Sequence, residues 1–312
     1  MTARMEGRGA SIVTGGGRGI GRAVALALAG AGHQVCVLDT GVALDGSGPD
    51  PAPAEAVAVE IGELGGEALA VDVDARSRTA AEAVVERAGA WTGSPPSALV
   101  HAAGTLRDAM VHRASDEDWS EVLGSHLAVG VELTRAMAGP MRREGFGRIV
   151  YVGGAAGLVG NAGQAAYAVA KAGLFGLTRA VALEMAGRDV CVNYVAPFAF
   201  TRMTESVPPV TERLREYLRW APLARPEDVA PLVAWLCSPA ASGVTGQVFG
   251  ARGAEMALWS QPRPVARLVE PGGWDAEALA AARARLEPHL VPLESEFDLF
   301  GGRPLAVGGH NG

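Results

Sequence analysis

The sequence has little cysteine and only one lysine. The three cysteines, Cys36, Cys191 and Cys237, stand singly in apolar runs without metal-like spacing, so we expect buried free thiols rather than disulfides or ligands. The six histidines form no ligand pattern, and no metal site is predicted. Of the 27 basic residues all but Lys171 are arginine, which marks 171 as a position where a compact ammonium is needed.

Basic patches and long hydrophobic runs are also missing. A net charge of −7 without a basic stripe or aromatic-interleaved arginine cluster argues against a nucleic-acid partner. No run of eighteen apolar residues occurs, so no membrane partner is expected. The N-terminus MTARMEGRGASIVTGG enters a strand-like segment within ten residues, which leaves no room for a signal peptide and predicts a cytoplasmic, reducing location.

What is present is an alternation of short apolar runs with longer helical patterns. Strands that alternate with helices predict an α/β fold, with a doubly wound parallel Rossmann sheet and ligands at the carboxyl ends of its strands. The predicted strands are ASIVTG (10–15), QVCVLD (34–39), ALAVDV (68–73), ALVHAAG (98–104), GRIVYVGG (147–154), VCVNYVAP (190–197) and GQVFGA (246–251).

The alternation of strand and helix patterns ends near Ala254. We therefore predict a single domain over residues 1–253 and an irregular C-terminal extension over 254–312, which packs on the domain or on a partner subunit. Residues 198–226 place Phe198 and Met203 among prolines, and predict either a mobile apolar lid over the substrate or ordinary surface packing.

A glycine-rich segment, TGGGRGIG (14–21), separates the first predicted strand from the first helix. Gly15 allows a tight turn, Gly19 lets the backbone approach a pyrophosphate, and Gly21 permits close helix packing. The helix N-terminus attracts phosphate, so this segment predicts a dinucleotide site.

Asp39, at the end of the second strand, indicates which nucleotide binds. Its carboxylate can accept hydrogen bonds from both ribose hydroxyls and would repel a 2′-phosphate. Arg18 could meet that phosphate, but it could equally contact the pyrophosphate or solvent. NAD is predicted, with NADP less favoured.

TGGGRGIG, Asp72, HAAG (101–104) and Tyr167-x-x-x-Lys171 together resemble the short-chain dehydrogenase/reductase family over residues 8–253. Within that family, residues 107–119, 160–177 and 196–205 are similar to the D-3-hydroxyacyl-CoA dehydrogenase part of multifunctional enzymes and their actinobacterial relatives. The resemblance implies a seven-stranded sheet and a homodimer or homotetramer packed through helices near 119–138 and 165–186. Cofactor contacts are implied for Ile20, Asp72, Val73, Ala103, Gly104, Pro197 and Thr201.

The resemblance implies that Tyr167 exchanges a proton with the substrate oxygen. Lys171, one turn later on the same helix face, would lower the pKa of Tyr167 and hold the nicotinamide ribose. Tyrosine has a reference pKa near 10, so a nearby cation has a defined role.

The family's serine, which hydrogen-bonds the substrate carbonyl, lies 13 residues before the tyrosine, and that position is Gly154. Its neighbours offer no hydroxyl, and loss of one such donor costs roughly 10²–10³ in rate. His126 matches the family's asparagine in a proton relay, or packs in the core or an interface. Asn161 and Gln164 could reach the substrate, although a structural role in their loop is preferred.

Three functions remain open from the sequence. The first is an NAD-dependent oxidoreductase that interconverts a secondary alcohol and a ketone on a bulky apolar substrate, such as an acyl thioester, steroid or polyketide. The second is a redox-neutral cyclase, dehydratase or isomerase that uses Tyr167 as acid and base. The third is a non-catalytic nucleotide-binding subunit.

Overall fold

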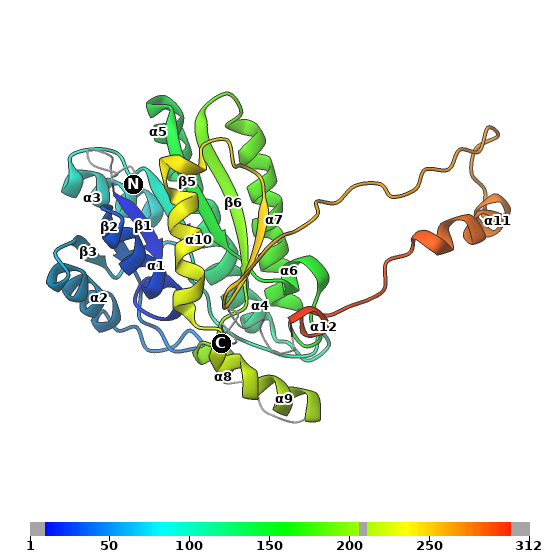
Figure 1. Ribbon diagram of the computed structural model, residues 1–312, viewed down its shortest axis with the longest axis horizontal. Helices are drawn as coiled ribbons and strands as arrows, with labels where there is room; N and C mark the ends of the chain where they lie inside the picture. The colour runs from blue at the N-terminus through cyan, green and yellow to red at the C-terminus, as the bar shows by residue number, and fades with distance from the viewer. Residues whose placement is uncertain (1–9, 206–210, 301–312) are drawn as a thin grey trace, which may run out of the picture.

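The architecture is an eight-stranded sheet between two layers of helices (Figure 1). A computed structural model describes residues 10–205 and 211–300. Its strand order is β3-β2-β1-β4-β5-β6-β7-β8, parallel except for the antiparallel β8. The strands are β1 (Ser11–Thr14), β2 (Gln34–Leu38), β3 (Glu67–Val71), β4 (Ala98–His101), β5 (Phe146–Val152), β6 (Asp189–Pro197), β7 (Val248–Arg252) and β8 (Glu255–Leu258).

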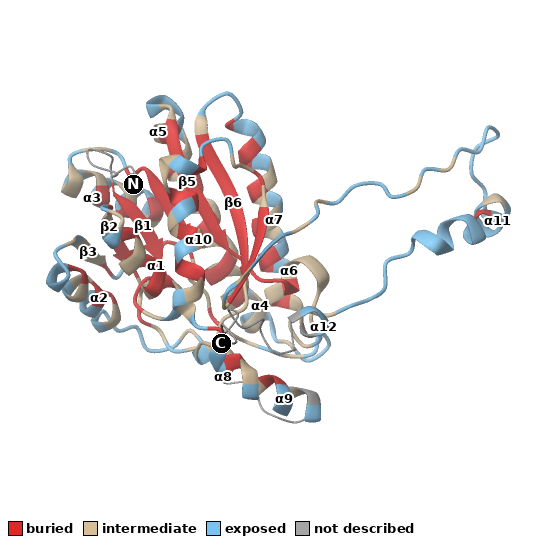
Figure 2. Ribbon diagram, in the orientation of Figure 1, coloured by how far each residue is buried: buried red, intermediate tan, exposed pale blue. Residues whose placement is uncertain are grey.

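Apolar helices cover both faces of this sheet, which is why its central strands are continuous apolar runs (Figure 2). One face carries α1 (Gly19–Gly30), α2 (Ala52–Glu63) and α10 (Pro226–Cys237). The other carries α3 (Arg78–Thr92), α5 (Val129–Glu144) and α7 (Ala165–Glu184). Shorter elements are α4 (Asp116–Leu123), the π-helical turn η1 (Gly124–Ala128), α6 (Ala156–Val159), α8 (Arg202–Glu205), α9 (Glu212–Trp220), η2 (Ala221–Leu223) and η3 (Pro239–Ala241).

The predicted Rossmann sheet is confirmed, with one strand more than expected. β8 pairs with β7 as a hairpin, and the predicted boundary at residue 253 falls in its turn, where Gly253 has φ +53°. The seven-strand expectation missed β8 because its residues, EMAL, are mostly exposed and show no buried-strand pattern.

The extension is less irregular than predicted. After β8 it runs away from the domain, forms α11 (Ala276–Leu286) and η4 (Glu287–His289), and returns to the domain at α12 (Glu296–Phe300) (Figure 1). Figure 2 shows most of this excursion exposed. Its exposed apolar side chains include Val269, Leu290 and Leu293. Residues 301–312 of the predicted extension lie outside the described residues.

The predicted lid segment, residues 198–226, is largely helical. It contains α8, α9 and η2, while residues 206–210 lie outside the described part of the chain. The N-terminus of α9 is capped by the Thr211 hydroxyl, which accepts from the Leu214 N–H at 3.1 Å.

Among the helices of the described residues, 10–205 and 211–300, only α7 has the length and composition of a membrane-spanning segment. Long core helices share that composition. In this fold α7 packs on the sheet through Leu174 and Val181.

Candidate active site

A cavity of about 790 Å³ opens at the carboxyl ends of the strands, around the point where the strand order reverses between β1 and β4. Every residue predicted to bind cofactor or substrate lies on its wall, as do three of the four predicted catalytic positions. The exception is Gly154, whose neighbour Gly153 lines the cavity instead.

The glycine-rich loop has the shape that a pyrophosphate requires. At Gly15, with φ +64°, a side chain would be strained and its Cβ would lie 2.8 Å from the Ala103 Cα. A Cβ at Gly21 would overlap the carbonyl oxygen of Gly15. The loop therefore lies tight against the β4 turn and leads into the N-terminus of α1, so these residues fit a dinucleotide phosphate.

Asp39 is fixed by the loops on either side of it. Its Oδ2 accepts from the Gly17 N–H at 2.8 Å, and its Oδ1 accepts from the Gly41 N–H at 2.7 Å. A carboxylate oxygen has room for a second hydrogen bond, so the side chain can still accept from a ribose.

Two arginines lie beside this carboxylate: Arg18, which the sequence pattern predicts, and Arg202, which it does not. Arg18 donates to the carbonyls of Gly41 and Val42, both at 3.1 Å. Arg202, on α8, donates to the same Val42 carbonyl at 3.3 Å. Burial and the charge of Arg18 lower the pKa of Arg202.

Tyr167 and Lys171 lie one turn apart on α7, as the spacing predicts. Lys171 is 3% exposed, and its Nζ donates to the Val152 carbonyl at 2.8 Å. The same nitrogen is 5.4 Å from the centre of the Tyr167 ring. Burial lowers the pKa of Lys171 to about 7.

The expected lowering of the Tyr167 pKa is not found. Burial, followed by the charges of Glu296, Tyr194 and Asp108, raises the pKa of Tyr167 well above its ordinary value. The difference has a physical reason, because Lys171 is itself desolvated and directs its ammonium to a backbone carbonyl.

At Gly154, where the resemblance implies a serine, the space for a side chain is filled. A Cβ there would lie 2.8 Å from the Tyr167 hydroxyl. Behind it, the Tyr194 hydroxyl accepts from the Gly154 N–H at 2.9 Å and donates to the Gly154 carbonyl at 2.8 Å. The glycine therefore lets the phenol of Tyr167 approach the backbone closely.

His126 lies in the π-helical turn η1, a distortion frequent at functional sites. Its Nε2 contacts the Thr105 carbonyl at 2.8 Å and must be the donor. Its buried Nδ1 has no hydrogen-bond partner among the described residues. The ring stands edge-on to Tyr167, 5.1 Å between centres, and burial lowers its pKa well below the ordinary value.

The carbonyl of His126 is already bound. It accepts from His101 Nε2 at 2.7 Å, while His101 Nδ1 accepts from the Thr14 hydroxyl at 2.8 Å. His101 is fully buried, and the residues that follow it, 102–104, line the cavity.

Asn161 and Gln164 form a chain of hydrogen bonds with Asp108. Asn161 Nδ2 donates to Gln164 Oε1 at 3.0 Å, and Gln164 Nε2 donates to Asp108 Oδ2 at 2.9 Å. Both amides thus connect the loop before Tyr167 to Asp108, and both also line the cavity.

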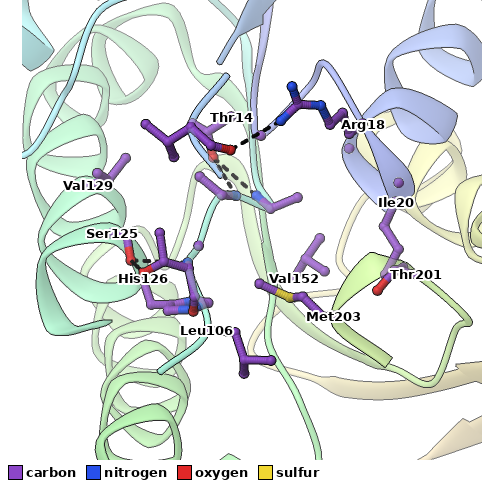
Figure 3. A pocket seen from close by; sticks show the side chains of 18 of the residues that line it. Thr14, Arg18, Ile20, Leu106, Ser125, His126, Val129, Val152, Thr201 and Met203 are labelled. Carbon is purple, nitrogen blue, oxygen red and sulfur yellow. Dashed lines mark hydrogen bonds between the residues drawn. The ribbon is translucent and has the colours of Figure 1, made fainter. Parts of the chain in front are cut away.

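The substrate end of the cavity has an aromatic wall. Phe198 packs edge-on against Tyr217 of α9, with ring centres 5.4 Å apart. Figure 3 shows Met203 and Thr201 on one side of the cavity and Ser125 and His126 on the other. Tyr217 was missed because its sequence, ERLREYLRW, is a mostly charged amphipathic helix.

The structure adds one residue that no sequence signal marks, Glu296 of the extension. Its backbone N–H donates to the Gly160 carbonyl at 3.2 Å. The backbone of Ala156 and of Ala155 favours the charged form of its carboxyl group, but less than burial disfavours it. Burial raises its pKa to about 7.

Comparisons with known proteins agree with this geometry. A family model described as enoyl-(acyl carrier protein) reductase matches residues 15–253. Peroxisomal multifunctional enzyme type 2 of Mus musculus is 41% identical over 234 residues, 75% of this chain and 30% of that protein. Hydroxyacyl-CoA dehydrogenase ChsB1 of Mycobacterium tuberculosis is 37% identical over 284 residues, 87% of this chain and 86% of that one.

A solved structure is similar over nearly the whole chain. It is a short chain dehydrogenase from Mycobacterium avium, 36% identical, with a TM-score of 0.78. The similarity covers 93% of this chain and 98% of that one, so it includes part of the extension.

Proposed function

Because the chain belongs to the short-chain dehydrogenase/reductase family, and is an enzyme of that kind, we propose that it is an NAD-dependent oxidoreductase that interconverts a 3-hydroxyacyl and a 3-oxoacyl thioester. The observation that carries the proposal is the pair Tyr167 and Lys171 on the wall of one cavity with the glycine-rich loop. A merely nucleotide-binding subunit would not need this pair.

The residues at the predicted cofactor end of the cavity support NAD as the cofactor. Gly15, Gly19 and Gly21 would hold the pyrophosphate, and Asp39 the adenosine ribose. When bound, the nicotinamide supplies or accepts the hydride. Thr201 and Pro197 lie on the cavity wall where the family contacts the carboxamide.

Tyr167 would give its proton to the substrate oxygen during reduction and take it back during oxidation. Lys171 would position the ribose and, when charged, stabilise the phenolate. Its buried setting suits the compact ammonium.

The substrate end supports an apolar acyl chain. Phe198, Met203 and Tyr217 line it, and the two relatives named above are a multifunctional enzyme and a hydroxyacyl-CoA dehydrogenase. The first of these is more than three times as long as the matched region, so its whole activity is not transferred.

A second candidate is a redox-neutral reaction on the same scaffold, with Tyr167 as acid and base. It is favoured by one observation: the position of the carbonyl-polarising serine is Gly154, and the Tyr167 hydroxyl occupies the adjacent space.

Self-association is part of the proposal. The excursion between β8 and α12 exposes apolar side chains that a second copy of this chain would cover, including Trp274, Leu279 and Leu290. The three buried free thiols support a reducing, cytoplasmic location.

The test is NADH oxidation with acetoacetyl-CoA and a long-chain 3-oxoacyl-CoA, for wild type and Tyr167→Phe. We expect reduction by wild type and a loss of about 10²-fold or more in the variant, with NADH affinity retained. NADH binding without reduction of either thioester would refute the redox proposal. Product formation without change in NADH would favour the second candidate.

A further inference from the structure

The extension returns to the domain at the active site and is fixed there by Glu296. The Glu296 N–H donates to the Gly160 carbonyl at 3.2 Å. The backbone of Ala155 and Ala156, the two residues after Gly154, acts electrostatically on its side-chain carboxyl, which lines the cavity. A residue remote in sequence thus lies beside the position that lacks the serine.

Glu296 also lies within electrostatic reach of the groups around the substrate end. Its charge acts on Tyr167 and Lys171 of α7, on Tyr194 of β6 and on Tyr217 of α9. These side chains come from three different elements, and Glu296 lines the same cavity as Tyr167, Lys171 and Tyr217. The carboxyl group therefore shares one cavity with the proton-transfer pair and the aromatic wall.

Three other polar side chains of this region have partners, and the Nδ1 of His126, unpartnered among the described residues, can only accept, because Nε2 carries the proton. Asn161 and Gln164 bond each other and Asp108, and the Tyr194 hydroxyl is held by Gly154. A protonated carboxyl group of Glu296 would have an O–H to donate. Burial raises its pKa to about 7, so a protonated fraction is present near neutrality.

We propose that Glu296, as a carboxylic acid, donates to the substrate carbonyl oxygen the hydrogen bond that the missing serine gives elsewhere in the family. A neutral carboxylic acid kept in an apolar site can stabilise developing oxyanion charge in this way. The proton that ends on the product alcohol comes from Tyr167, and Glu296 keeps its own. The inference rests on the proposed ketone reduction.

Three variants and one control test this role with acetoacetyl-CoA as substrate. Glu296→Ala removes the donor, Glu296→Gln keeps an N–H donor of similar size, and Glu296→Ala with Gly154→Ser supplies a hydroxyl from the other position. Glu294→Gln, an exposed neighbour in the same segment, is the matched control. Thermal melting and NADH affinity are measured for each protein.

We expect Glu296→Ala to lower kcat by about 10²-fold, Glu296→Gln to keep most of the activity, and Gly154→Ser to restore at least part of the loss. Glu294→Gln should behave like wild type. Infrared difference spectra should show the carbonyl stretch of a protonated carboxyl group that shifts when acetoacetate binds and is absent in Glu296→Gln.

The outcomes separate this inference from the proposed function. If wild type reduces the substrate and Glu296→Ala has an equal or higher kcat, the inference alone is overturned. A higher kcat would mean that the carboxyl group blocks the site. No reduction by wild type would overturn the proposed function and this inference together. An infrared band unaffected by ligand would also count against substrate contact.

Discussion

The hydroxyl oxygen of Tyr167 lies 2.8 Å from the point where a Cβ of residue 154 would stand. The two positions therefore compete for the same space. Any side chain at 154 has to displace the end of the tyrosine ring, which is a flexible group on a rigid helix.

Gly154→Ser and Gly154→Ala separate this displacement from the chemistry of a hydroxyl. Alanine forces Tyr167 to move without adding a donor, so we expect kcat to fall. Serine forces the same movement but adds a preorganised donor, worth roughly 10²–10³ in rate where it is well placed. We expect Ser to exceed Ala by about 10-fold or more in NADH-linked reduction. Equal rates would mean that a hydroxyl here has no use in this site.

The buried hydroxyl of Tyr194 should matter for stability. It bonds both the N–H and the carbonyl of Gly154. The carbonyl also accepts from the Gly157 N–H at 3.1 Å, so Tyr194→Phe removes the partner of the Gly154 N–H. A buried unsatisfied group costs about 1–3 kcal/mol, and we expect a decrease of that size in the free energy of unfolding by denaturant. Tyr151→Phe is the control, since its hydroxyl bonds only the Thr134 side chain, which keeps its bond to the Gly130 carbonyl. A smaller effect at 194 than at 151 would contradict this account.

Much of this site could be predicted from the sequence, because many of its residues are defined by short spacings along the chain. The loop containing Gly15 and the pair Tyr167 and Lys171 are each defined by spacing within one or two turns of chain. Asp39 follows from its place after a strand. Local spacing was enough to bring these residues to one cavity.

Glu296 and Tyr194 could not be predicted in the same way. Glu296 reaches the site after an excursion of more than thirty residues, and nothing in the pattern around it specifies where the chain returns. The hydroxyl of Tyr194 acts on Gly154, 40 residues away, through the register of β5 and β6. Burial likewise reversed the expected direction of the Tyr167 pKa, because desolvation depends on packing from all sides.

Replacing Lys171, the only lysine, by arginine, the basic residue at every other position, should impair activity. Lys171 is 3% exposed and aims one ammonium at the Val152 carbonyl, whereas a guanidinium is larger, planar and always charged. We expect Lys171→Arg to reduce kcat by about 10²-fold or more and to weaken NADH binding in fluorescence titration. The reverse exchange at an exposed site, Arg142→Lys, should leave both unchanged. Wild-type behaviour of Lys171→Arg would show that only a positive charge is needed.

Nucleotide preference should depend on Asp39. Asp39→Ser removes the charge that would repel a 2′-phosphate and leaves the cations of Arg18 and Arg202 close by. We expect the ratio of the NADH to the NADPH dissociation constant to rise by about 10-fold or more, since one charge–phosphate interaction is worth over 1 kcal/mol. Asp45→Asn, exposed on the following loop, is the control. An unchanged ratio would place discrimination elsewhere.

Docking of α12 should weaken as Glu296 ionises. Its pKa is raised from 4.5 to about 7, so the folded state favours the protonated form. The stability that this group contributes is fully present below about 4.5, declines as the pH rises, and is lost above about 7. Lys171 faces the carboxyl and opposes the shift when charged, whereas Tyr167, Tyr194 and Tyr217 stay neutral over this range.

Glu296→Gln isolates that contribution because an amide does not titrate. We expect the wild-type melting temperature, relative to that of Glu296→Gln, to fall between about pH 5 and 7 and then to level off. Hydrogen exchange at the Glu296 N–H, which bonds the Gly160 carbonyl, should accelerate over the same range beyond its intrinsic pH dependence. Glu294→Gln should leave both measurements as in wild type. A difference between wild type and Glu296→Gln that does not change with pH would mean that folding does not shift the pKa of this carboxyl, which would contradict its proposed burial as a neutral acid.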